Sequence, residues 1–82
     1  MAQSITINSP VDVTAIGFGR NMREYPRRIE FQGAIYDFID AGVRTVVQRE
    51  GRISQIFTMT DGFRDYRLRS DGGGWTLLSM TR

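Results

Sequence analysis

The basic side chains of this sequence are all of one type. All eleven are arginine, and lysine is absent. The guanidinium group is permanently charged, forms paired hydrogen bonds with carboxylates and phosphates, and stacks on aromatic rings. A genome that favours arginine codons produces the same bias everywhere in the proteome. The bias therefore indicates binding chemistry only where the fold gathers several arginines on one surface.

Catalytic and metal-binding chemistry have few candidate residues. Histidine and cysteine are both absent, which removes the commonest general base, the thiolate nucleophile and the usual metal ligands. Asp37 and Asp40 are three positions apart, so on a strand they would point to opposite faces. Gly17-Phe18-Gly19 lacks the third glycine of a dinucleotide-binding loop. We therefore predict a protein that is not an enzyme, with no cofactor and no metal site.

Length and composition predict one folded domain. The 82 residues are 40% hydrophobic and 24% charged, which is typical of a small globular protein. We assign residues 11–82 to a single β domain and residues 1–10 to a flexible N-terminal segment, whose order the sequence leaves open. Apolar stretches are too short to span a membrane, and the N-terminus lacks the pattern of a secretory signal. We expect a cytoplasmic protein.

Glycines divide the chain into stretches rich in β-branched and aromatic residues, which is the composition of strands. The pattern predicts an all-β fold: a small, strongly bent antiparallel sheet, or an SH3-like or OB-like barrel, of about five to seven strands. A turn at Gln32-Gly33 predicts a first hairpin with Arg28 opposite Asp37. A three-residue loop before Arg52 predicts a second hairpin.

Two further turns complete the predicted registers. Asp61-Gly62 is typical of a type I′ turn and would pair Phe57 with Tyr66, while the loop 71–74 would pair Ser70 with Trp75. The resulting alternation predicts one inner, core-facing set: Val43, Val47, Ile53, Phe57, Met59, Tyr66, Leu68, Trp75 and Leu77. In the first hairpin, Ile29, Phe31, Tyr36 and Phe38 are predicted to join this core.

The opposite face gathers arginines beside aliphatic side chains. Its candidate partner-binding residues are Arg44, Arg52, Ile56, Arg67, Arg69 and Leu78, with Ile56 and Leu78 both opposite Arg67. Three interpretations remain open. In the first, the arginine stems simply cover scattered apolar residues. In the second, the N-terminal strand packs over the face through Ile5, Ile7 or Val13. In the third, the face binds a partner.

One resemblance adds to the residue-level reading. The run from Pro26 to Tyr36 (PRRIEFQGAIY), with the later Tyr66-Arg67-Leu68 and Trp75-Thr76-Leu77, resembles a group of small uncharacterised bacterial β domains. The resemblance implies a bacterial source and a β fold, and it brings no activity or functional residue.

Together these patterns predict a non-catalytic interaction module that uses the arginine-rich face to bind another protein or an acidic partner. Binding of single-stranded nucleic acid is one alternative, because small barrels stack bases on aromatic side chains in a basic groove. A structural subunit that pairs with copies of itself is the other alternative.

Overall fold

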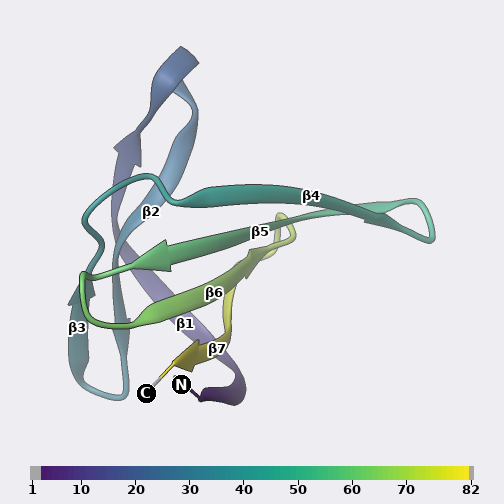
Figure 1. The fold of residues 1–82 in the computed structure, drawn as a ribbon. Coiled ribbons are helices and arrows are strands. Elements are labelled where there is room, and N and C mark those ends of the chain that lie inside the picture. The colour runs from purple at the N-terminus through teal and green to yellow at the C-terminus, as the bar shows by residue number, and fades with distance from the viewer. Residues whose placement is uncertain (1–2, 82) are drawn as a thin grey trace.

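The stretches rich in branched and aromatic side chains do form strands. The computed structural model describes residues 3–81, and almost all of its regular structure is antiparallel β-sheet (Figure 1). The all-β prediction is confirmed. The strands are β1 (Ser4–Phe18), β2 (Glu24–Phe31), β3 (Ala34–Asp37), β4 (Val43–Arg49), β5 (Arg52–Thr60), β6 (Asp65–Ser70) and β7 (Trp75–Thr81), and a short 3₁₀ segment, η1 (Arg20–Met22), follows β1.

The sheet is strongly bent around a single core. Its seven strands have the order β3-β2-β1-β7-β6-β5-β4, so a flat sheet would hold β2 about 19 Å from β5, at four strand spacings. Ile29 of β2 nevertheless packs in the same buried cluster as Phe57 and Met59 of β5. We call the side of the sheet that faces this cluster the inner face and the opposite side the outer face.

The two ends of the sheet, β3 and β4, are not paired with each other in the described chain. The segment between them crosses this gap: the Phe38 N–H donates to the Arg27 carbonyl at 2.9 Å, and the Ile39 N–H donates to the Thr60 carbonyl at 3.0 Å. The Phe38 side chain is buried in the core. The bent sheet is thus an open one whose gap is covered by a connecting segment.

The N-terminal strand lies within the sheet, between β2 and β7. Residues 4–10, the part of the chain whose order the sequence left open, form the first half of β1, and Ser4 lies opposite Thr81. The first two residues of that predicted flexible segment lie outside the described residues.

Residues 3–81 contain no helix with the length and apolar character needed to cross a membrane.

Two predicted registers are confirmed. Arg28 lies opposite Asp37 in the β2–β3 hairpin, whose turn residues Gln32 and Gly33 both have positive φ. Ser70 lies opposite Trp75 at the start of the β6–β7 hairpin.

The predicted register of the β4–β5 hairpin is wrong. Arg49 lies opposite Arg52, so the loop has two residues. Glu50 has φ 52° and Gly51 has φ 76°, the positive values that a type I′ turn requires at both positions. The predicted three-residue loop would pair apolar residues across the hairpin, with Val47 opposite Ile53 and Val43 opposite Phe57. Every residue of β4 is exposed, so burial did not select the register.

The predicted type I′ turn at Asp61-Gly62 is also wrong, because Asp61 caps a longer loop. Its carboxylate accepts hydrogen bonds from the N–H groups of Phe63 and Arg64, both at 2.8 Å, and from the Tyr66 hydroxyl at 2.7 Å. The loop therefore spans residues 61–64, and Met59 rather than Phe57 lies opposite Tyr66. The register moves by two positions, so each side chain keeps its predicted face.

The same loop shifts the ionisation of two side chains. Burial opposes the charged form of Asp61, but the hydrogen bonds from the Arg64 N–H, the Tyr66 hydroxyl and the Phe63 N–H outweigh it and lower the pKa of Asp61. Burial and the hydrogen bond to Asp61 both raise the pKa of Tyr66.

The core largely follows the predicted pattern. Its buried hydrophobic residues are Ile29, Phe38, Phe57, Met59, Tyr66, Leu68 and Leu77. Phe31, Tyr36 and Trp75 are partly buried and pack against this cluster. The core prediction is wrong for Val43, Val47 and Ile53, which are exposed. Val43 and Val47 lie on the outer face, and Ile53 lies on the inner side where the β4–β5 hairpin extends past the core.

Candidate functional site

The outer face of β4, β5 and β6 is a regular grid of side chains, because residues directly opposite each other in an antiparallel pair share a face. One row contains Thr45, Ile56, Arg69 and Thr76, and the next contains Val43, Thr58, Arg67 and Ser79. Two shorter rows continue along the β4–β5 hairpin: Val47 opposite Ser54, and Arg49 opposite Arg52.

Arg44 is a correction to the predicted site. It lies opposite Phe57 and therefore on the inner side of the sheet, where its Nη1 donates a hydrogen bond to Oε1 of Gln55 at 2.9 Å. The corrected β4–β5 register moves Arg44 off the outer face and brings Arg49 onto it. The outer face still carries four arginines: Arg49, Arg52, Arg67 and Arg69.

The other predicted residues are distributed as follows. Ile56 is on the outer face, but it lies directly opposite Arg69, with Arg67 as a diagonal neighbour. Leu78 is not opposite Arg67, since Leu68 pairs with Leu77 and Arg67 pairs with Ser79. Leu78 is the extra residue of a β-bulge, which turns the strand locally.

The N-terminal strand does not cover the outer face. β1 pairs edge to edge with β7, and Ile7 and Val13 pack against the core on the inner side. The interpretation in which these residues form a second core over Ile56 is therefore wrong. Arg52 and Arg67 are exposed, while Ile56, Arg69 and Leu78 are half-buried.

Few carboxylates balance the arginines of the outer face. Arg49 and Arg52 are directly opposite each other, an arrangement of like charges that destabilises a strand pair. In the described chain, the ion pair closest to this face joins Arg69 Nε to Asp71 Oδ2 at 3.9 Å. The Nε atom of Arg69 is buried and has no hydrogen-bond acceptor, so an external acid would not reach it. Arg49, Arg52 and Arg67 are exposed, and their guanidinium groups are the ones that an external acid could pair.

Apolar side chains lie among these arginines. Val43 and Val47 are exposed on β4 and share the outer face with Ile56. Sequence reasoning missed the positions of Val43, Val47 and Arg49. The signal was present in Glu50-Gly51, whose two-residue turn fixes the register that brings them together.

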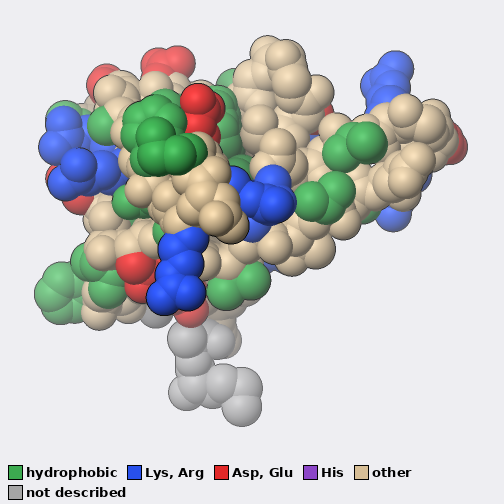
Figure 2. Space-filling model, turned by 90° about the horizontal axis from the view of Figure 1, so that it is seen from above, with side chains coloured by type: hydrophobic (Ala, Val, Ile, Leu, Met, Phe, Trp, Pro, Cys, Tyr) green, Lys and Arg blue, Asp and Glu red, His purple; other side chains and the backbone are tan. Residues whose placement is uncertain are grey.

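The outer half of the β4–β5 hairpin projects from the rest of the molecule. β6 pairs with β5 only from Gln55 onward, so residues 47–54 continue as a two-stranded ribbon that we call the arm (Figure 1). Seen from above, hydrophobic and basic side chains stand along this projection (Figure 2).

The aromatic rings are placed differently from those of a base-stacking surface. Phe57 and Trp75 pack together with their centroids 5.4 Å apart, and Tyr66 packs between Tyr36 and Phe38 at 5.3 and 5.2 Å. All of these rings belong to the core or pack against it. The arginines of the outer face therefore have no adjacent aromatic platform among these residues.

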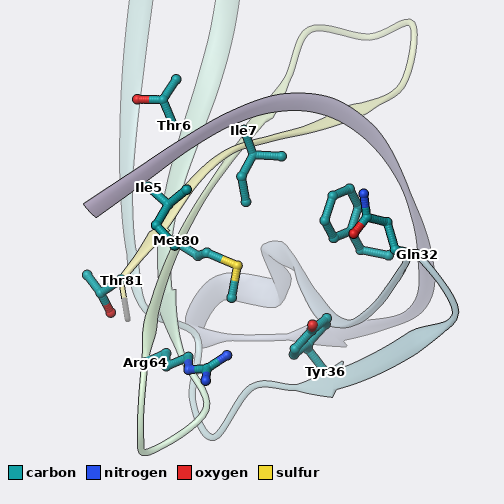
Figure 3. A pocket seen from close by; sticks show the side chains of 9 residues that line it. Ile5, Thr6, Ile7, Gln32, Tyr36, Arg64, Met80 and Thr81 are labelled. Carbon is teal, nitrogen blue, oxygen red and sulfur yellow. The ribbon is translucent and has the colours of Figure 1, made fainter. Parts of the chain in front are cut away.

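A hollow of about 680 Å³ opens at one end of the bent sheet. Side chains of Ile7, Tyr36, Arg64 and Met80 approach it from four different elements (Figure 3). Among the described residues that line it, Arg64 is the only charged one and none is a carboxylate. These residues do not supply the paired carboxylates of a hydrolytic site.

Metal-binding residues do not cluster in residues 3–81: no three acidic side chains come close enough together to hold an ion. Comparisons with protein-family models, with curated proteins and with solved structures found no match to this chain. The resemblance to small bacterial β domains stays a prediction, and the argument for function depends on the geometry of the outer face.

Proposed function

We propose that this domain is a non-catalytic binding module whose outer face recognises an acidic segment of another protein. The observation that carries the proposal is the gathering of four arginines on that face, two of them directly opposite each other. An acidic partner would relieve the repulsion between Arg49 and Arg52 and pair the exposed guanidinium of Arg67.

The apolar residues of the face favour a protein partner over a bare polyanion. Val43, Val47 and Ile56 form a strip beside the arginines, and interfaces combine an apolar centre with arginine-rich surroundings. Nucleic acid is supported less well, because most aromatic rings lie in the core or pack against it. The exposed rings of Phe18 and Phe63 are not in the rows of the outer face, where bases would need them for stacking.

A short fluorescent polyglutamate peptide with leucines at its centre provides a direct test by fluorescence anisotropy. We expect saturable binding that weakens as salt rises. The double variant Arg49→Glu with Arg52→Glu should weaken binding about tenfold or more, because two exposed pairs at up to about 1 kcal/mol each are lost and repulsion is added.

The matched control is Arg44→Glu, which makes the same charge change on the inner side of β4 as the single variant Arg49→Glu makes on the outer face. It should affect binding much less than Arg49→Glu. Equal weakening by these two single variants would mean that net charge alone drives binding and would refute the outer face as the site. Stronger binding of an oligothymidylate than of the peptide would favour the nucleic-acid alternative.

Val47→Ser tests the apolar part of the face. We expect it to weaken peptide binding while leaving the circular dichroism spectrum unchanged, because Val47 lies on the arm, outside the core. Unchanged affinity would remove Val47 from the binding surface.

A further inference from the structure

The free edge of β4 is an unused strand-pairing surface. β4 is the last strand in the sheet order and pairs only with β5. Its register with β5 is continuous from Val43 to Arg49, without a bulge. Figure 1 shows this edge running along the projecting hairpin.

This edge has few of the usual protections against pairing. Natural edge strands are typically short, bulged, or marked by proline or by charged side chains, above all lysine. β4 has seven residues (VRTVVQR) with no proline, its charged residues are Arg44 and Arg49, and none of the seven is buried. Val43, Val46 and Val47 are 65%, 53% and 37% exposed, and Ile53 on the neighbouring strand is 63% exposed. Isolated two-stranded ribbons are marginally stable in water, so the arm gains most from an additional strand.

We infer that β4 pairs antiparallel with β4 of a second copy of this chain, which gives a two-fold symmetric dimer with one continuous sheet. The inference is independent of the acidic partner proposed above.

Backbone geometry supplies the hydrogen bonds for this pairing. Arg49 and Arg52 flank a two-residue turn, and such residues exchange both of their backbone hydrogen bonds. Bonded and non-bonded pairs alternate along an antiparallel ladder. The N–H and C=O groups of Arg44, Val46 and Gln48 therefore point to the free edge, where a second β4 can pair with them.

The side chains favour a second copy when the two-fold axis passes through Val46. Val46 then faces Val46, Arg44 faces Gln48 and Val43 faces Arg49, so no arginine is opposite another. The two Arg44 side chains are offset by four residues, about 13 Å along the strand. This offset exceeds the Debye length of about 8 Å at physiological ionic strength, so their repulsion is largely screened.

The symmetry has a consequence for binding. Residues opposite each other in the new pair share a face, so the two outer faces lie on the same side of the joined sheet. The eight arginines of two protomers would form one surface, and a long acidic segment could contact both halves.

Molar mass in solution, measured by sedimentation equilibrium over a range of concentrations, is the first test. We expect a reversible dimer. Val46→Pro removes an N–H that points to the free edge while sparing the bonds to β5, and Val46→Lys places like charges at the two-fold axis. Each should raise the dimer dissociation constant by at least about tenfold, which corresponds to about 1.4 kcal/mol.

Ile53→Lys is the matched control, because it replaces an equally exposed apolar residue of the arm that is not on the edge strand. Its dimer should persist. A monomer at every concentration, or a dimer that survives both Val46 substitutions, would overturn the inference. Each variant is checked by circular dichroism, and Val46→Lys is preferred if Val46→Pro is misfolded.

The absence of cysteine gives a second, independent readout. In a Val46→Cys variant, the two thiols would lie across the symmetry axis, and a short thiol-specific reagent should crosslink them. In an Ile53→Cys variant the thiols would be separated by three strand spacings across the sheet and by four residues along it, about 20 Å in total. Efficient crosslinking through position 53 rather than 46 would contradict the proposed arrangement.

Discussion

Replacing Asp61 with alanine should destabilise the domain strongly although Asp61 is not in the hydrophobic core. The carboxylate organises the β5–β6 loop through the N–H groups of Phe63 and Arg64, both at 2.8 Å, and it accepts the Tyr66 hydroxyl at 2.7 Å. Asp61→Ala removes all three contacts. It leaves the hydroxyl of fully buried Tyr66 without this acceptor.

The expected loss follows from these contacts. The two N–H groups are exposed and can form hydrogen bonds with water instead, so the loss of each bond to Asp61 costs about 0.5–1 kcal/mol of stability. A buried hydroxyl left without an acceptor costs about 1–3 kcal/mol. The sum is about 2–5 kcal/mol. A domain of this length has a total stability of about 4–12 kcal/mol, so the variant loses a large part of its free energy of unfolding.

Urea unfolding, followed by Trp75 fluorescence and by far-ultraviolet circular dichroism, measures this loss at neutral pH. Tyr66→Phe serves in a double-mutant cycle, because it removes the hydroxyl that Asp61→Ala leaves unpaired. The double variant should be destabilised by less than the sum of the two single variants, with a coupling of about 1 kcal/mol or more. A loss below about 0.5 kcal/mol for Asp61→Ala, or additive effects, would refute the reasoning.

The same contacts predict a dependence on pH. Folding lowers the pKa of Asp61 below its ordinary value of 3.8, so the folded state favours the charged carboxylate. Its contribution is complete above the unfolded pKa and is lost as pH falls through the folded pKa. Asp61→Asn, which cannot ionise, should lose less stability than the parent chain as pH is lowered below about 4. Parallel pH profiles for the two proteins would contradict this assignment.

Two further substitutions test the packing of the connecting segment and the weight of a surface ion pair. A Cβ at Gly42, which has φ +62°, would clash with the Thr58 carbonyl oxygen, whereas a Cβ at Gly72, with φ +87°, meets nothing within 4 Å. In urea unfolding, Gly72→Ala should therefore lower the free energy of unfolding by about 1 kcal/mol, and Gly42→Ala should lower it by at least about 1–3 kcal/mol more. Equal losses in the two variants would contradict the close approach at Gly42. The exposed ion pair between Arg28 Nε and Asp37 Oδ1, 2.6 Å apart, should contribute less than about 1 kcal/mol to the free energy of unfolding. A larger loss in Arg28→Ala, measured by thermal unfolding, would contradict this and would show that the pair helps to fix the β2–β3 register.

The sequence predicts the fold best where one side of a strand must be buried. Met59, Tyr66 and Leu68 each lie between two polar residues, and a one-residue slip would expose them all. Their inner placement survives even though the β5–β6 register is shifted by two positions. Side-chain alternation therefore predicts which face is buried more reliably than which residues are opposite each other.

The candidate site depends on information that alternation does not contain. On β4, valines occupy both faces and the whole strand is exposed, so matching apolar residues across the hairpin gave the wrong partner for Arg44. The two-residue Glu50-Gly51 turn decided the register, and it sets Gln48 opposite Ile53 and Arg44 opposite Phe57, so the matching of apolar residues argued against it. The capping of the 61–64 loop was missed because Asp-Gly is also typical of a two-residue turn.

The position of β1 between β2 and β7 implies an order of folding. The hairpins β2–β3, β4–β5, β5–β6 and β6–β7 join neighbouring stretches, whereas Ser4 and Thr81 meet across almost the whole chain. Such distant contacts have a high loop-closure cost and form slowly. During synthesis, the edge of β1 that pairs with β7 therefore stays without its backbone hydrogen bonds until β7, the last strand described, has left the ribosome.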